Sequence, residues 1–242
     1  MPTLNKWVAD TAEKVFASQF RPVEVTAAEM LDERLKHVRL EGDLSASRYT
    51  DGNTIEFRVS DREFRHYTPS FYDREGGVCD VLFYLHGLGP GSDWASKLQV
   101  GSTTRLMGPS NKMAVRPEQT CHLLFGDESS MGFVNGFVKS AALKGQRCDV
   151  LLELDDAHKH WPELLNIEAT VVEKSRELPA DAAHRWLQQQ TEAQWQALND
   201  TAIYLTGRAR SIQRLKQLFK SQGIDKRQVQ TVPYWAENKR GL

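Results

Sequence analysis

The 242-residue chain is long enough for two compact domains or one large one. Hydrophobic residues make up 40% and charged residues 26%, the composition of an ordinary soluble globular protein. The 31 basic and 32 acidic side chains give a formal charge of −1, which attracts neither nucleic acid nor a membrane surface, so we expect neither as a partner. Cys79, Cys121 and Cys148 are widely spaced without a Cys-x-x-Cys pair, so the sequence suggests neither a disulfide framework nor a zinc or iron–sulfur site.

The first twenty residues do not resemble a secretion signal, because Asp10, Glu13 and Lys14 interrupt their apolar side chains. The sequence contains no run of about 18 apolar residues, the length that a membrane-spanning helix needs. We therefore expect no membrane span and a cytoplasmic location. Apolar residues recur at helical spacing over residues 3–18, which predicts an amphipathic helix there.

From Val23 onward the hydrophobic pattern alternates with a period of two. Strands are predicted over residues 23–26, 35–40, 54–59, 63–68, 78–85 and 101–107. Short alternating strands separated by turn residues such as Asp51-Gly52-Asn53 are typical of an antiparallel β-barrel. The sequence therefore predicts a barrel over residues 21–109, within a first domain that spans residues 1–115.

The pattern changes after Arg116-Pro117-Glu118, which we interpret as a linker. Apolar strands are predicted over residues 120–125, 148–154, 167–172, 201–205 and 228–232, and helices over residues 131–141, 182–198 and 208–222. Strands that alternate with helices indicate a parallel sheet covered on both faces. The second domain, residues 116–242, is therefore predicted to be α/β.

Two stretches of the first domain carry groups suited to one large ligand. In Arg65-His66-Tyr67-Thr68 the guanidinium can fork onto a diphosphate, the phenol ring can cover a flat heterocycle, and the threonine can hydrogen-bond its edge. In the loop from His86 to Ala95, glycines allow close approach to a diphosphate, and the helix that starts near Ser92 directs amides at the anion. Together these stretches predict an FAD site.

With Gly108-Pro109, Gly126-Asp127-Glu128 and Tyr234-Trp235 added, the order of motifs resembles the siderophore-interacting protein family from about Arg21 to Gly241. Members of that family are FAD-binding NAD(P)H ferric-chelate reductases, a branch of the ferredoxin reductase superfamily. The resemblance implies an N-terminal β-barrel FAD-binding domain followed by an α/β parallel-sheet NAD(P)H-binding domain. It also implies FAD as cofactor, NADPH or NADH as co-substrate, and a ferric siderophore as substrate.

The resemblance assigns roles to residues of the first domain. Arg65 would contact the FAD phosphates, Tyr67 would pack on the ribityl or isoalloxazine region, and Thr68 would reach the flavin N5 edge. Tyr67 and Thr68 are thus the predicted catalytic residues. The second loop would close on the FAD through His86, Gly87, Gly89, Ser92 and Trp94.

In the second domain, the resemblance places Gly126, Asp127 and Glu128 at the nicotinamide side of the flavin and Tyr234-Trp235 near the flavin. Ser175, Arg176 and Arg208 are predicted to bind the nucleotide, because related reductases bind the adenosine 2′-phosphate with a serine and an arginine placed like the first pair. This favours NADPH over NADH. Each assignment has a structural alternative. Asp127 could simply cap a helix, the two arginines could be solvated, and Tyr234-Trp235 could belong to a tail that docks on the barrel.

The sequence departs from the family pattern at Ser102, Ser130-Met131-Gly132 and Pro233. Two alternatives in the same fold are a flavin reductase that serves a protein acceptor and a siderophore-binding protein without turnover. A third is an α/β-hydrolase, because Leu85-His86-Gly87-Leu88-Gly89 resembles an oxyanion loop and Ser130 could serve as its nucleophile. His158-Lys159-His160 is interpreted as a solvated segment, not a metal site. We expect a monomer.

Overall fold

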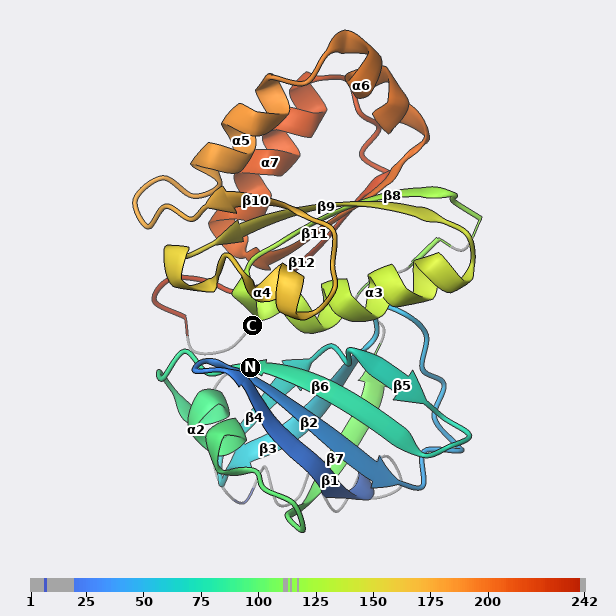
Figure 1. Ribbon diagram of the computed structural model, residues 1–242, viewed down its shortest axis with the longest axis vertical. Helices are drawn as coiled ribbons and strands as arrows, with labels where there is room; N and C mark the ends of the chain where they lie inside the picture. The colour runs from blue at the N-terminus through green and yellow to red at the C-terminus, as the bar shows by residue number, and fades with distance from the viewer. Residues whose placement is uncertain (1–6, 8–19, 111–112, 114, 117, 240–242) are drawn as a thin grey trace. The chain divides into compact units, whose positions relative to one another are not determined.

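The computed structural model describes residues 7, 20–110, 113, 115–116 and 118–239. The chain divides into two compact units between residues 112 and 113. The first unit is built mainly of strands, and the second of strands that alternate with helices (Figure 1). The helix predicted over residues 3–18 lies outside the described residues, apart from Trp7.

The first unit is a curled antiparallel sheet of seven strands in the order β4-β3-β7-β1-β2-β6-β5 (Figure 1). The strands are β1 (Phe20–Asp32), β2 (Leu35–Gly42), β3 (Thr54–Ser60), β4 (Glu63–Tyr67), β5 (Phe71–Asp73), β6 (Val78–Tyr84) and β7 (Thr103–Ser110). This architecture confirms the predicted antiparallel β class. The alternation did not predict β5, which has only three residues and pairs with β6.

The alternating pattern works as expected within these strands. In β2, Val38 and Leu40 are fully buried, whereas Arg39 between them is exposed. Inward-facing side chains of this kind form one core with helix α2 (Pro90–Lys97), which contributes Ala95. The helix that carries the glycine-rich loop is thus fixed to the sheet by apolar packing.

The second unit is a parallel sheet of five strands in the order β10-β9-β8-β11-β12. The strands are β8 (Cys121–Gly126), β9 (Arg147–Leu154), β10 (Thr170–Glu173), β11 (Ala202–Arg208) and β12 (Val229–Trp235). Helices α3 (Met131–Leu143) and α4 (Trp161–Leu164) cover one face, and α5 (Asp181–Gln188), α6 (Glu192–Ala197) and α7 (Ala209–Ser221) lie on the other (Figure 1). The predicted α/β class is confirmed.

The strand order determines where a ligand can bind. From β8 the chain moves outward to β9 and β10, then returns to β11 on the other side of β8. The carboxyl ends of β8 and β11 therefore flank the point where the order reverses, and open parallel sheets bind ligands at that point.

Several predicted boundaries differ from the structure; the strand predicted over residues 23–26, for example, runs from Phe20 to Asp32, and two other differences have a clear local cause. The helix predicted over residues 182–198 is interrupted, because Thr191 begins a new helix: its hydroxyl accepts a hydrogen bond from the Gln194 N–H, and Gln194 Oε1 accepts one from the Thr191 N–H. This capping box has the recognisable spacing Thr-x-x-Gln. The strand predicted from residue 167 begins only at Thr170, since the Ile167 N–H instead bonds to the Pro162 carbonyl after α4.

Within the described residues, no helix has both the length and the apolar character needed to cross a membrane.

Candidate functional site

The two motifs predicted to bind FAD meet at Gly91, the second residue of α2. A Cβ atom built on Gly91 would lie 2.7 Å from Tyr67 Oη and 3.2 Å from Arg65 Cγ. A larger residue here would press on the Tyr67 and Arg65 side chains, so glycine lets α2 begin this close to β4. Arg65 and Tyr67 share one face of β4, as the alternation predicts, and that face is the one that meets the helix.

Two hydrogen bonds fix the loop before α2, one of them to the helix itself. Ser92 Oγ accepts the Gly87 N–H at 3.0 Å, and His86 Nδ1 accepts the Leu88 N–H at 3.2 Å. Burial lowers the pKa of His86, which is consistent with a neutral ring that can accept. Gly87 and Gly89 have φ values of 75° and 85°, and a Cβ atom at either would meet nothing within 4 Å. The loop thus offers open space beside a glycine backbone.

These features fit a diphosphate. Helix α2 begins after Gly89 without a side-chain cap, and an uncapped helix N-terminus favours an anionic group. Arg65 adds a guanidinium at the same strand end; its charge is partly neutralised by Glu63, whose Oε1 it contacts at 2.9 Å, and it also donates to the Phe64 carbonyl at 2.8 Å. Thr68 follows directly and is buried.

Two aromatic residues of the predicted site pack into the core of the first unit. The Tyr67 ring lies 4.7 Å from Phe83 and 6.1 Å from Phe57, and the Trp94 ring lies 5.9 Å and 5.1 Å from the same two rings. Burial raises the pKa of Tyr67 well above its ordinary value. In the structure, both residues therefore fix α2 against the sheet; their contact with a flavin stays a prediction.

Lys36 is a residue of this site that the sequence did not single out. Its Nζ donates to the carbonyls of Ala95, Ser96 and Leu98 at 3.1, 3.0 and 2.6 Å, and the side chain is buried. Burial lowers the pKa of Lys36. Leu35 beside it is also buried, so the period of two gave no sign that this lysine points inward. Lys36 caps the far end of the helix whose start carries the loop.

In the second unit, Asp127 lies at the reversal point of the sheet. Its Oδ1 accepts the Ser129 N–H at 2.9 Å, which is the predicted cap, and its Oδ2 accepts the indole N–H of Trp235 at 2.7 Å. Gly207, at the end of β11, has φ 94°, and a Cβ atom there would lie 2.7 Å from the Asp127 carboxyl carbon. The glycine is required for this close approach.

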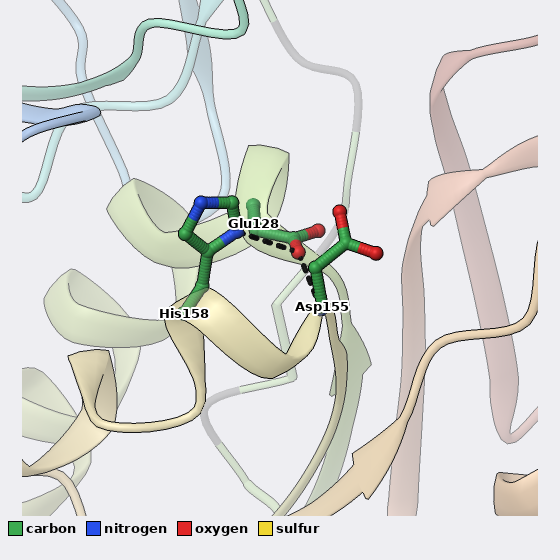
Figure 2. Close-up of side chains that lie close together, drawn as sticks. All are labelled: Glu128, Asp155 and His158. Atoms are coloured by element: carbon green, nitrogen blue, oxygen red, sulfur yellow. Dashed lines mark hydrogen bonds and ion pairs between the residues drawn. The ribbon is translucent and has the colours of Figure 1, made fainter.

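Glu128, next in the chain, is the centre of a buried network (Figure 2). Its Oε1 accepts the Asp155 N–H at 2.8 Å and contacts His158 Nδ1 at 3.1 Å, and its Oε2 pairs with Lys174 Nζ at 2.5 Å. Asp155 and His158 follow β9, and Lys174 follows β10. The carboxyl ends of three adjacent strands therefore converge on one carboxylate.

The charges of this network set its protonation. Burial alone would raise the pKa of Glu128, but the charge of Lys174 and three hydrogen bonds outweigh it and lower that pKa. Burial raises the pKa of Asp127, although Lys174 opposes the shift. Burial would lower the pKa of Lys174, but the two carboxylates raise it instead. Glu128 is thus an ionised acceptor paired with a charged lysine.

Glu128, Asp155 and His158 bring possible metal-ligand atoms within 4.8 Å of one another. The hydrogen-bond pattern argues for a salt bridge and against a metal site. An ionised carboxylate can only accept, and the Glu128 carboxylate is already in contact with the Lys174 ammonium, the Asp155 N–H and the His158 ring. His158 Nδ1 therefore carries its hydrogen and donates. The interpretation of His158 as solvated was wrong: it is buried against Trp161, whose ring lies 4.3 Å away.

The predicted nucleotide residues separate into two kinds. Ser175 and Arg176 lie in the loop after β10, and Arg176 is exposed. Arg208 is buried, and its guanidinium bonds to the carbonyls of both these residues and to Glu237. A cavity of about 280 Å³ lies over the first half of α7 and is lined by Pro179, Arg210, Gln213, Arg214 and Gln217.

The last predicted pair lies at the end of β12. Tyr234 and Trp235 are half-buried, and the Trp235 ring lies 5.3 Å from Lys174 Nζ and 5.5 Å from Arg208 Cζ. Together with its bond to Asp127, these contacts fasten Trp235 to its own unit. It is not a free docking tail.

The hydrolase alternative fails on Ser130. This serine is fully buried, its Oγ bonds to Thr206 Oγ1 at 2.9 Å, and it accepts the Asp127 N–H at 3.3 Å. A nucleophile must instead be exposed at the top of a strand-to-helix turn. The antiparallel first unit also has no counterpart in that fold.

Two family profiles match the chain in succession. The profile for the siderophore-interacting FAD-binding domain matches residues 35–113, and the profile for the siderophore-interacting protein matches residues 119–238. Among curated proteins, the ferric vibriobactin reductase ViuB of two Vibrio cholerae strains is 25% identical over 181 residues. That alignment covers 72% of this chain but 65% of the relatives, so less than two thirds of their length.

Solved structures share the fold. The siderophore-interacting protein of Acinetobacter baumannii is similar with a TM-score of 0.72 and 17% identity, over 91% of this chain and 92% of that one. The ferredoxin reductase of carbazole 1,9a-dioxygenase gives a TM-score of 0.73 and 17% identity, over 89% of this chain and 68% of that one.

Proposed function

Because the chain belongs to the siderophore-interacting protein family, we propose that it is an FAD-dependent reductase that uses NADPH to reduce Fe(III) held in a siderophore. The first unit, which contains the FAD-binding domain of that family, would hold the cofactor. The second unit would hold the nucleotide at the carboxyl edge of its parallel sheet.

The observation that carries the proposal is the close approach at Gly91. It joins a strand end bearing Arg65 and Tyr67 to a helix start that follows an open glycine loop. A positive side chain, an uncapped helix N-terminus and a glycine backbone at one place are the elements of a diphosphate site. FAD supplies both the diphosphate and the flat ring that such a site suits.

When bound, FAD accepts a hydride from a reduced nicotinamide and passes the electrons on singly. The overall reaction is then NADPH plus two Fe(III) chelates giving NADP⁺, one proton and two Fe(II). Fe(II) is a softer ion, held more weakly than Fe(III) by hard oxygen donors, so reduction releases the metal. The protein binds and orients the reactants; no side chain has to transfer a proton.

The charges along the carboxyl edge of the second unit favour one orientation of the nucleotide. Near β8 and β9 the edge carries the carboxylates of Glu128 and Asp155 beside the ammonium of Lys174, and the buried carboxyl groups of Asp127 and Glu153, whose pKa values are raised by burial. The nicotinamide ring, which becomes a cation when it loses its hydride, suits this end. A phosphate is repelled there.

Basic side chains flank this acidic segment, in the loop after β10 and at the start of α7 after β11. Arg176 follows β10, and Arg210 and Arg214 line the cavity of about 280 Å³ over the start of α7. Arg214 is partly neutralised, since it bonds to Asp181 at 2.8 Å, which leaves Arg176 and Arg210 to attract the phosphates. Together with Ser175 they support NADPH, whose additional 2′-phosphate would lie beside the Ser175-Arg176 loop.

The test is a visible absorption spectrum of the purified protein, reconstituted with FAD under anaerobic conditions. We expect flavin bands near about 450 nm that bleach with NADPH and return with ferric vibriobactin, the substrate in the name of the ViuB relatives. A protein that takes up no FAD would contradict the proposal. Bands that bleach but return only with oxygen would leave a flavin reductase with another acceptor.

A further inference from the structure

We propose that Arg208 is a positioning residue that holds the Ser175-Arg176 loop in the shape that selects NADPH over NADH. The inference rests on the proposed function, in which that loop binds the adenosine 2′-phosphate. It changes the role predicted for Arg208 from the sequence: the guanidinium acts through the loop and does not touch the phosphate.

The hydrogen bonds of Arg208 carry the inference. Nη1 donates to the Ser175 carbonyl at 2.7 Å, Nη2 donates to the Arg176 carbonyl at 2.8 Å, and Nε donates to Glu237 Oε1 at 2.5 Å. Nη2 also pairs with Glu237. All three nitrogens are thus engaged by protein acceptors, and the side chain is only 5% exposed.

These partners come from three different strand ends. Arg208 ends β11, Ser175 and Arg176 follow β10, and Glu237 follows β12. The β10 strand is at one edge of the sheet and β12 at the other, so no ladder hydrogen bond connects their loops. One guanidinium provides that connection, and Trp235 packs over it at 5.5 Å.

Fixing two successive carbonyls determines what the loop presents on its other side. With the Ser175 and Arg176 carbonyls turned toward Arg208, the loop closes through a bond from the Leu178 N–H to Ser175 Oγ at 3.0 Å. A hydroxyl that accepts still has its own hydrogen to donate, here to a phosphate oxygen. Arg176 is exposed beside it, so a serine and an arginine are preset for one dianionic group.

An arginine is needed for this task. Its planar fork can serve two carbonyls and a carboxylate in fixed directions, whereas a lysine ammonium is a point donor on a flexible stem. Removal of Glu237 would leave a buried guanidinium short of its counter-charge but would keep both loop carbonyls bonded. Glu237 should therefore contribute less than Arg208.

The experiment measures binding of 2′,5′-ADP and 5′-AMP to the FAD-loaded protein by calorimetry. The wild type should bind 2′,5′-ADP more tightly, and Arg208→Gln should reduce that preference about tenfold while 5′-AMP affinity changes little. Arg208→Lys should lose the preference for 2′,5′-ADP as Arg208→Gln does. Arg227→Gln is the matched control, because Arg227 also forks onto a carboxylate, that of Asp225, before β12.

Each outcome decides one claim. If the wild type prefers 2′,5′-ADP and Arg208→Gln keeps the full preference, the positioning role is overturned while the proposed function stands. A proportional loss of both affinities would also overturn it, since that is what a merely structural arginine gives. If the wild type shows no preference, the NADPH assignment and the inference fall together. Should Arg208→Gln not fold, Glu237→Gln must show a smaller loss of preference in the same direction.

Discussion

The two units hold their candidate sites together by different means. In the first unit the site is mostly backbone: glycines, an uncapped helix start, and one buried lysine at the far end of that helix. In the second unit the site is a network of buried charges, in which Glu128, Lys174 and Arg208 each bond to groups from other strand ends. A backbone site is sensitive to added volume, whereas a charge network is sensitive to the loss of any one partner.

The largest effect is expected from Lys174→Met. Lys174 is 11% exposed and is the shared cation of Asp127 and Glu128. Breaking a buried ion pair by removing one partner costs about 3–5 kcal/mol. Urea unfolding followed by tryptophan fluorescence should show that loss, and Lys216→Met, at an exposed lysine of α7, should show almost none. Equal stability of the two variants would contradict a stabilising role of this ion pair.

A second prediction concerns the charged cluster of the first unit. Burial alone would raise the pKa of Asp80, but hydrogen bonds from Arg39 and His37 lower it from 3.8 to about 2. Because the pKa of Asp80 is lower in the folded than in the unfolded protein, ionised Asp80 stabilises the fold at any pH above the ordinary pKa. This contribution, about 2 kcal/mol, is lost as the pH falls from about 4 to 2.

The check is the unfolding free energy of wild type and Asp80→Asn at pH 6 and again near pH 2. The difference between the two proteins should shrink at the lower pH, because the carboxylate of the folded wild type is then about half protonated and most of its stabilising contribution is lost. A difference of the same size at both values would show that the pair of Asp80 and Arg39 adds nothing through charge.

The backbone site can be tested by adding one carbon. Gly91→Ala would place a Cβ atom 2.7 Å from Tyr67 Oη, and overpacking of this kind costs about 1–3 kcal/mol. We expect FAD affinity, measured by quenching of flavin fluorescence, to fall at least about tenfold. Because the closest atom is the hydroxyl oxygen, the double variant Tyr67→Phe with Gly91→Ala should recover part of the loss relative to Gly91→Ala alone. Strictly additive effects would contradict a direct clash.

The smallest effect on binding is expected from Lys36→Met, which removes three hydrogen bonds from the end of α2. With the helix less firmly held, FAD affinity should drop about tenfold or less. Lys97→Met is the control in the same helix, since Lys97 is exposed in its last turn. If both variants bind FAD like wild type, Lys36 stabilises the helix without a role for the cofactor.

The sequence predicted local features better than contacts between distant segments. Alternation correctly placed Arg65 and Tyr67 on one face, and the position of Asp127 after an apolar strand indicated a cap. The bond between Asp127 and Trp235 spans 108 residues, so no local pattern could reveal it. Lys36 and Lys174 were missed for the same reason: the acceptors to which each lysine donates lie far from it along the chain.

Arg208 shows the limit most clearly. An arginine after a strand end is a reasonable phosphate ligand by residue type, but its donors are directed at two main-chain carbonyls and Glu237. Those carbonyls carry no sequence signal, because every residue has one. Residue type therefore indicated this region of the sheet, but it could not indicate the two carbonyls and Glu237 to which the guanidinium bonds.

The most direct test of the central claim is the yield of Fe(II) per NADPH. FAD-loaded protein would be mixed anaerobically with a limiting amount of NADPH, an excess of ferric vibriobactin and a colour-forming Fe(II) chelator. The proposed function predicts two Fe(II) for each NADPH oxidised, and no Fe(II) when FAD is withheld. Oxidation of NADPH without Fe(II), or the same Fe(II) yield without FAD, would contradict it.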